Sequence, residues 1–266
     1  MRTVQIEYLR PHEIQEARQH CSIVYLPVAP LEWHGPAMPY GTDPLIAQTL
    51  ARRVALRTGG VVMPTLFFGT ERERPAFILE AKGFEDPENL YIKGMDVPAN
   101  CMKSYYARED IFALTVREHL RLLVEQGYKL IVLVNGHGAT GQRSSLDRLA
   151  KEFSGETDSY VLYHMIDIFA EDFQPDFGHG TLIETSLIRH ICDENVDLSQ
   201  LPPRDVPLKY TEYGIADDTV FEGKRTPGDC VIHDPRDATA ELGKRCMDNA
   251  VENLCREVEK IYASID

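Results

Sequence analysis

Apolar residues alternate along the chain between two patterns, short continuous runs and longer stretches with a helical period. The continuous runs predict buried strands, which we expect over 22–28, 61–66, 129–134 and 160–164. Stretches in which apolar residues recur every three or four positions predict helices over 44–56, 110–126, 141–153, 181–192 and 235–263. Strands that alternate with helices in this way predict an α/β fold, with a mostly parallel central sheet that helices cover on both faces.

Two long segments lie outside this alternation. Residues 67–100 are rich in charge, glycine and proline and show no period, and residues 195–233 form a long polar loop. The first segment holds apolar side chains that need cover, which a neighbouring subunit could provide; they are Phe77, Ile78, Leu79, Phe84, Leu90, Tyr91, Ile92 and Met95. The sequence has no repeat and no linker-like stretch. We therefore expect a single domain over 1–266 that assembles as an oligomer.

Composition and charge narrow the classes of protein to consider. The chain has 266 residues, of which 43% are hydrophobic and 26% charged, so a disordered chain is excluded. The apolar runs stay shorter than about 18 residues, so we expect no membrane-spanning helix and no membrane partner. A net charge of -14 argues against nucleic acid as a partner. The six cysteines are scattered without a CxxC pair, which we interpret as reduced thiols in a cytoplasmic protein.

Histidines and carboxylates follow three of the predicted strands. They are Glu32, His34 and Asp43 after the first, His137 after the third, and His179 and Glu184 beyond the fourth. Parallel sheets bind ligands at the carboxyl ends of their strands, so we expect these side chains to meet at one edge. Imidazole with carboxylate suits Zn²⁺, Mn²⁺ or Fe²⁺. A set without cysteine argues against a closed structural zinc site, so a cation here could bind and activate water.

Each of these residues also has a structural explanation. Asp43 precedes a proline, which makes it an ideal N-cap of the following helix. Glu32 and His34 could be solvated loop residues, His179 a buried histidine with satisfied hydrogen bonds, and Glu184 a charge on a helix face. If all four explanations held, the chain would be a plain α/β domain without metal. It is the joint position after consecutive strands that favours a metal site.

Five sequence blocks, in order along the chain, resemble the creatininase (creatinine amidohydrolase) family. The first has the family's Pro-x-Gly/Ala-x-x-Glu-x-His-Gly-Pro pattern, and later blocks carry Gly-Thr-Asp, Asn-Gly-His-Gly, His-x-x-x-x-Glu-Thr-Ser and Asp-Pro-x-x-Ala-Thr. The matching ranges are 27–36, 41–43, 135–138, 179–186 and 234–239. The resemblance implies a three-layer α/β/α fold with a dinuclear metal site, in an enzyme that is commonly a homohexamer.

The resemblance also implies residue roles. Glu32 and His137 would ligate one divalent ion, His34 would ligate the other, and Asp43 would bridge the two. Glu184 would be a further ligand or lie just behind the ligands. Either His179 or Glu184 would transfer the proton. The implied activity is hydrolysis of a C–N bond in a small cyclic amide or formamide by a metal-activated water.

In three places the chain departs from the family's usual pattern. Ala139 stands where creatinine-hydrolysing members carry a glutamate, residues 37–39 replace a His-Leu-Pro, and residues 69–74 replace a Gly-x-Ser-x-x-His. These departures make creatinine itself a doubtful substrate. The alternatives are a hydrolase of another small ring substrate, such as a cyclic ketone, or a metal-stabilised binding protein without catalysis. Four further residues have open roles, namely Glu71, Glu73, His164 and His233.

Overall fold

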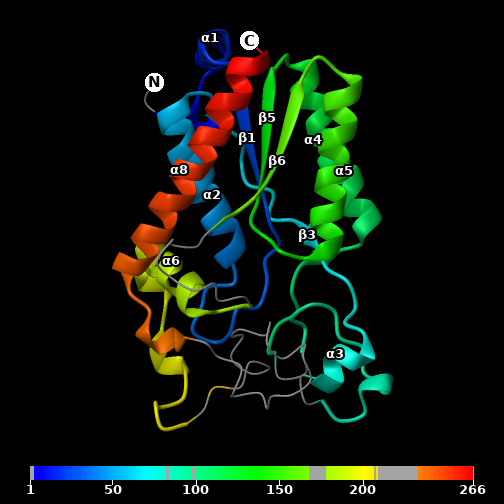
Figure 1. Ribbon diagram of the computed structural model, residues 1–266, viewed down its shortest axis with the longest axis vertical. Helices are drawn as coiled ribbons and strands as arrows, with labels where there is room; N and C mark the ends of the chain where they lie inside the picture. The colour runs from blue at the N-terminus through cyan, green and yellow to red at the C-terminus, as the bar shows by residue number, and fades with distance from the viewer. Residues whose placement is uncertain are drawn as a thin grey trace.

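A computed structural model of the chain describes residues 3–81, 84–97, 100–167, 178–206, 208 and 233–265 (Figure 1). Its α-helices are α1 (Pro11–His20), α2 (Thr42–Thr58), α3 (Ala76–Ala81), α4 (Glu109–Glu125), α5 (Thr140–Glu156), α6 (Leu182–Cys192) and α8 (Ala240–Ile265). Short 3-10 turns occupy Ile6–Tyr8, Pro87–Asn89, Asp193–Asn195, Leu198–Gln200 and Pro235–Asp237. Within the described ranges, strands and helices alternate as the hydrophobic pattern predicts.

The central sheet has four parallel strands in the order β2-β1-β5-β6. They are β1 (Ile23–Val28), β2 (Val61–Val62), β5 (Leu130–Asn135) and β6 (Tyr160–Met165). β1 pairs with β5 along its whole length, from Ile23 opposite Leu130 to Val28 opposite Asn135. The carboxyl ends of these two strands therefore lie side by side, which confirms the expected parallel sheet.

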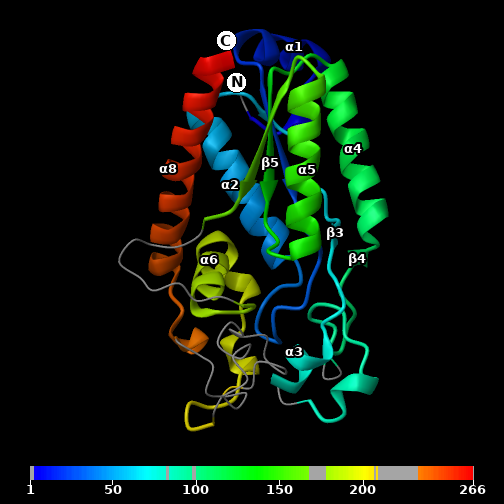
Figure 2. The ribbon, with the colours of Figure 1, turned by 45° about the vertical axis from the view of Figure 1, so that its right-hand side comes forward.

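Side chains of the sheet divide between two apolar clusters, one on each face. Ile23 and Tyr25 of β1 pack with residues of α2, α6 and α8, whereas Val24 and Leu26 pack with residues of α4 and α5. Figures 1 and 2 accordingly show α2 and α8 on one side of the sheet and α4 and α5 on the other. The three-layer α/β/α arrangement is confirmed.

The second predicted strand is shorter than its apolar run. Only Val61–Val62 pairs with β1 as regular strand. Pro64 then has no N–H to offer the ladder. The chain nevertheless stays beside β1, because the Leu66 N–H donates to the Pro27 carbonyl at 2.9 Å. The expectation of a strand over 61–66 is thus right at its start and wrong for its second half.

The last helix begins later than expected. Residues Pro235–Asp237 form a separate 3-10 turn, in which the Asp234 carboxylate accepts a hydrogen bond from the Arg236 N–H at 2.8 Å. The helix α8 starts only at Ala240 and continues to Ile265. The expected helix start at residue 235 is therefore wrong, because Pro235 belongs to the turn.

The irregular segment after β2 builds a small structure of its own. A two-stranded parallel ladder joins β3 (Gly69–Thr70) to β4 (Tyr106–Ala107), and Leu79, Ile92 and Val97 form a separate buried cluster. The expectation that these apolar residues lack cover within the chain is therefore wrong for Leu79 and Ile92. Phe77 and Tyr91 do remain exposed, at 65% and 78%. Figure 2 shows this segment, with α3, in the half of the molecule away from both termini.

Two composition-based expectations can be compared with the described residues. None of the described helices is long and apolar enough to cross a membrane. Among the described cysteines, Cys101, Cys192 and Cys255 are free thiols. Cys230 and most of the predicted 195–233 loop lie outside the described residues.

Candidate metal centre

Asp43 lies in the first turn of α2, but it does not cap the helix. Gly41 occupies the N-cap position, which makes no side-chain capping hydrogen bond. The Asp43 carboxylate is instead buried between two imidazoles, with Oδ1 3.0 Å from His34 Nε2 and Oδ2 3.1 Å from His137 Nδ1. The positive end of the α2 dipole favours a carboxylate there. The capping explanation for Asp43 is therefore wrong.

Glu32 and His34 follow β1 on an extended segment and are both buried, at 0% and 1% exposure. The solvated-loop explanation for them is therefore wrong. The His34 Nδ1 lies 3.1 Å from the backbone carbonyl oxygen of Glu32, to which it donates. This hydrogen bond uses the outer ring nitrogen and leaves Nε2 facing Asp43, as a histidine ligand requires.

His137 is held by a tight turn at the end of β5. The Asn135 side chain donates to the His137 carbonyl at 2.8 Å and accepts from its N–H at 3.1 Å. Gln142 in turn donates to the Asn135 amide oxygen at 2.8 Å. A Cβ at Gly136 would lie 2.6 Å from the Asp43 carbonyl oxygen, so only glycine lets β5 end this close to α2. Sequence analysis did not identify the role of Gln142, which is fully buried.

Glu184 enters the site from the first turn of α6. Thr181 caps this helix by accepting a hydrogen bond from the Glu184 N–H at 3.3 Å. One carboxylate oxygen of Glu184 accepts from the Gly180 N–H at 2.7 Å, and the other lies 3.9 Å from His34 Nε2. Glu184 therefore points into the cluster and is not a solvated charge on a helix face.

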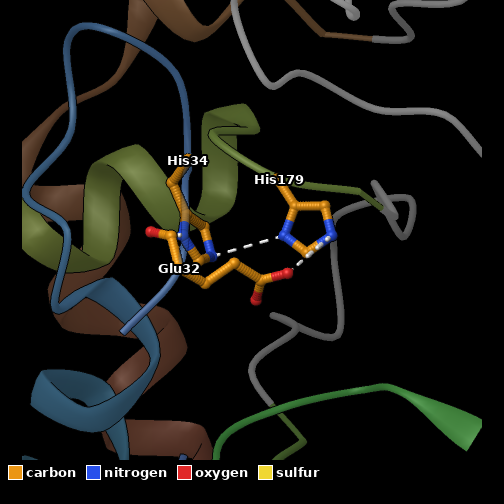
Figure 3. A group of neighbouring side chains, drawn as sticks. All are labelled: Glu32, His34 and His179. Atoms are coloured by element: carbon orange, nitrogen blue, oxygen red, sulfur yellow. Dashed lines mark hydrogen bonds and ion pairs between the residues drawn. The ribbon is translucent and has the colours of Figure 1, made fainter. Parts of the chain in front are cut away.

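His179 approaches the same point from the segment before α6. Its Nδ1 lies 3.4 Å from His34 Nε2, and its Nε2 lies 3.9 Å from Glu32 Oε1. Figure 3 shows the three side chains of Glu32, His34 and His179 converging from two separate parts of the chain. The side chain of His179 is 19% exposed, which makes it more accessible than the imidazoles of His34 and His137.

All six residues predicted for the site therefore come together. Three groups offer ligand atoms that lie within 4.8 Å of one another: Glu32 with Asp43 and His137, His34 with Asp43 and Glu184, and Glu32 with His34 and His179. The first two groups share Asp43, whose Oδ1 faces His34 and whose Oδ2 faces His137. This is the arrangement that a carboxylate bridging two cations requires.

The buried carboxylates of the cluster need positive charge nearby to stay ionised. Burial alone would raise the pKa of Glu32 and of Asp43, but the neighbouring imidazoles outweigh burial and hold both pKa values below their usual range. Burial opposes a charge on His34, yet Asp43 and Glu184 outweigh it and raise the pKa of His34 to about 10. Protons on the histidines thus neutralise the carboxylates where divalent cations could do so instead.

Glu184 differs from the other carboxylates. Burial raises the pKa of Glu184 to about 8, against the opposing effect of His34. Without metal, this carboxyl group can therefore carry a proton near neutral pH.

The donor atoms fit a divalent cation. Glu32 Oε2 is buried and has no hydrogen-bond donor among the described residues, although it lies 3.0 Å from His137 Nδ1. A buried carboxylate oxygen without a donor is costly unless a cation satisfies it. The mixed imidazole and carboxylate set is of the kind that binds Zn²⁺, Mn²⁺ or Fe²⁺.

Of the four residues with open roles, Glu71 lies beside the cluster. His164 lies against α8, with Nδ1 2.9 Å from Glu257, and Glu73 is an exposed acceptor for the Tyr91 hydroxyl. Among the described residues, neither His164 nor Glu73 makes a hydrogen bond or ion pair with the cluster. Glu71, by contrast, lies 4.0 Å from His137 Nε2. His233 lies outside the three ligand groups formed by the described residues.

Comparison with known proteins gives relatives of similar length. A family model described as creatininase (creatinine amidohydrolase) matches residues 7–80 and 103–258. The creatinine amidohydrolase of Pseudomonas putida is 24% identical over 272 residues, which cover 95% of this chain and 94% of that protein. A 2-amino-5-formylamino-6-ribosylaminopyrimidin-4(3H)-one 5'-monophosphate deformylase of Methanothermobacter thermautotrophicus is 27% identical over 239 residues, which cover 88% of this chain and 87% of that protein.

Solved structures give the same fold. A crystal structure of creatinine amidohydrolase (creatininase) matches with a TM-score of 0.70 and 22% identity, covering 98% of this chain and 99% of that one. Two further creatininase structures, described as the Mn form and as a mutant of the Zn-Zn type, match with TM-scores of 0.68 and 0.67 and 22% identity, covering 98% of this chain and 99% and 98% of theirs. Because the family model matches most of its length, the chain belongs to the creatininase family.

Proposed function

We propose that this chain is a dinuclear metal-dependent hydrolase that cleaves a C–N bond in a small cyclic amide or formamide. The observation that carries the proposal is the buried Asp43 carboxylate, whose two oxygens face the imidazoles of His34 and His137 separately. The family contributes the hydrolase class. The names of the two relatives, an amidohydrolase and a deformylase, support a C–N bond as the target.

Each cation has its own ligands in this proposal. Glu32, Asp43 and His137 would hold one ion, and His34, Asp43 and Glu184 would hold the other. Zn²⁺, Mn²⁺ and Fe²⁺ all suit these donors. The descriptions of the related structures, one with Mn and one of the Zn-Zn type, support zinc and manganese first.

The side chains around the cations would move the proton. Bound divalent cations lower the pKa of water towards about 7 and polarise a carbonyl group. His179 is the more exposed imidazole of the cluster, and it stands 3.4 Å from His34. Glu184 lies 3.9 Å from His34 Nε2 and is held in place by the Gly180 N–H. We assign proton transfer to the leaving nitrogen to one of these two residues.

Metal content and turnover test the proposal together. The chain is stripped with a chelator, reloaded with Zn²⁺ or Mn²⁺ and desalted, and its ions are counted by mass spectrometry. The wild-type chain should keep two ions and hydrolyse members of a panel of lactams and formamides. His34→Ala and His137→Ala should each keep at most one ion, whereas His119→Ala, which changes an imidazole of α4 outside the cluster, should keep both.

The same measurements, with cyclic ketones added to the panel, separate the alternatives. Full occupancy in both His34→Ala and His137→Ala would refute the site. Two ions with turnover of cyclic ketones alone would point to the other hydrolase class, and two ions without any turnover to a binding protein. If His179 rather than Glu184 transfers the proton, His179→Ala should keep both ions and lose about 10²–10⁴-fold in kcat, the usual contribution of a proton-transfer residue.

A further inference from the structure

The two ligand histidines differ in what their outer nitrogen contacts. His34 donates through Nδ1 to the Glu32 carbonyl, so its ring is fixed from behind. His137 faces the cluster with Nδ1, and its buried Nε2 has no hydrogen-bond partner among the described residues. A metal-bound histidine normally donates its other N–H to a carboxylate, a carbonyl or water, which sets its tautomer and orientation. A partner for His137 Nε2 is therefore expected nearby.

Glu71 places a carboxylate beside this nitrogen. It follows directly after β3, its Oε2 lies 4.0 Å from His137 Nε2, and its Oε1 accepts from the Arg72 N–H at 2.7 Å. A small side-chain movement or one water would close the 4.0 Å gap. The side chain is only 18% exposed, so the carboxylate points inward rather than into solvent.

Tyr106 holds the neighbouring ligand, Glu32, in a similar way. Its hydroxyl accepts from the Met95 N–H at 3.2 Å and donates to Glu32 Oε1. An ionised carboxylate can only accept, so the direction of the second hydrogen bond is fixed. With Oε1 occupied by Tyr106, Glu32 presents Oε2 towards His137 and Asp43.

The β3–β4 ladder positions both Glu71 and Tyr106. The β3–β4 ladder pairs Gly69 with Tyr106, so the start of the turn that carries Glu71 lies beside β4. Gly94 packs against the pair with a φ of 54°, and a Cβ there would lie 2.6 Å from Glu71 Cγ and 2.6 Å from the Tyr106 hydroxyl. The backbone at residue 94 thus leaves just the room that these two side chains occupy.

We propose that Glu71 and Tyr106 are positioning residues for the cation site formed by Glu32, Asp43 and His137, and that they leave the site of His34 and Glu184 unaffected. Glu71 accepts from the Nε2–H of His137, and Tyr106 donates to Glu32. The inference rests on the proposed dinuclear site, but it assigns Glu71 and Tyr106 to one cation only.

Metal titration can resolve the two sites. Calorimetric titration of the metal-free chain with Zn²⁺, and visible absorption spectra with Co²⁺, are compared for wild type, Glu71→Ala, Glu71→Gln and Tyr106→Phe. The matched controls are Glu73→Gln, two residues after Glu71, and Tyr105→Phe, directly before Tyr106. Both control side chains are exposed, and their cation affinities should equal those of the wild type.

The expected result is selective. Glu71→Ala and Tyr106→Phe should weaken one of two binding events by about 10–100-fold, the usual effect of removing a residue behind a ligand, and leave the other unchanged. They should also change the Co²⁺ spectrum. Glu71→Gln should recover most of the loss, because its amide oxygen still accepts a hydrogen bond.

Three outcomes would overturn the proposal. Wild-type affinities and spectra in both Glu71→Ala and Tyr106→Phe would refute it while leaving the dinuclear site intact. Equal weakening of both binding events, together with a lowered melting temperature of the metal-free chain, would indicate a merely structural role. A wild-type chain that binds no cation would refute the proposed function, and this inference with it.

Discussion

The carboxylate of Asp43 is the single group on which both proposed cation sites depend. In Asp43→Asn, one oxygen becomes an NH₂ group, which cannot accept and cannot ligate a cation. We expect at most one ion per chain and a loss of most turnover. Helix α2 should be little affected, because Asp43 makes no capping hydrogen bond. Mass spectrometry of the desalted protein measures the ion count.

A matched control distinguishes the loss of the Asp43 carboxylate from a general effect on a helix. Asp110 lies in the first turn of α4 as Asp43 does in α2, but it faces Arg108 at the surface. Asp110→Asn should therefore leave the ion count and the turnover unchanged. If Asp43→Asn behaved like Asp110→Asn, the bridging role of Asp43 would be wrong.

The sequence predicted the site residues better than their surroundings. Glu32, His34, Asp43, His137, His179 and Glu184 could be found because each follows a strand or begins a helix whose apolar pattern is clear. Tyr106 and Glu71 belong to segments without a period. Only the β3–β4 pairing brings them together, and a two-residue ladder leaves no readable pattern in the sequence.

At the scale of elements, the close approach of β5 to α2 depends on Gly136. The Cβ in Gly136→Ala would lie 2.6 Å from the Asp43 carbonyl oxygen and 3.1 Å from the Ala47 Cβ, both on α2. The strand end would have to move away and carry His137 from Asp43. We expect unfolding to become easier by about 1–3 kcal/mol, as for other overpacked sites, with weaker metal binding. Urea unfolding and metal titration measure the two effects.

Gly155 supplies the control for this substitution. A Cβ at Gly155, within α5, would meet nothing within 4 Å. Gly155→Ala should therefore stabilise the chain slightly, by about 0.5–1 kcal/mol, through helix propensity alone. If Gly136→Ala were as stable as the wild type, the close contact with α2 would not require glycine at residue 136.

The differences between the predicted and the observed elements have two physical reasons. Helix α1 buries none of its residues completely, so it has no apolar stripe to detect, and its Pro11 start and Glu13 capping contact were the only signals. Residues 63–66 run beside β1 without forming regular strand because Pro64 interrupts the ladder. Apolar periodicity finds elements that bury a face, and it misses those that do not.

At the scale of the whole molecule, the buried charges should make stability depend on pH when metal is absent. The pKa values of His34 and Glu184 are raised to about 10 and about 8, from ordinary values of 6.5 and 4.5. A raised pKa gives stability that is complete below the ordinary value and is lost as pH rises through the raised one. The lowered pKa values of Glu32 and Asp43 matter only in acid.

The melting temperature of the metal-free chain should therefore fall between pH 7 and pH 10. With Zn²⁺ bound, the histidines have already lost their protons, so the fall should be smaller. Circular dichroism melts with a chelator and with Zn²⁺ measure both curves. A metal-free melting temperature that is constant or rises over this range would contradict the electrostatic account, and His34→Ala should flatten the curve.

The expected assembly also belongs to this scale. A hexamer, or another oligomer, stays a prediction that light scattering can test, and a particle of 30.2 kDa would refute it. Phe67, Phe77 and Tyr91 are large apolar side chains of the irregular segment that remain exposed in the described structure. The single domain over 1–266 and the cytoplasmic location likewise stay predictions.

Anomalous X-ray diffraction at the manganese edge, on crystals of the Mn²⁺-loaded chain, tests the shared bridge most directly. We predict two anomalous peaks per chain on either side of the Asp43 carboxylate, one beside Glu32 and His137 and the other beside His34 and Glu184. A single peak, or peaks that do not contact Asp43, would contradict the account.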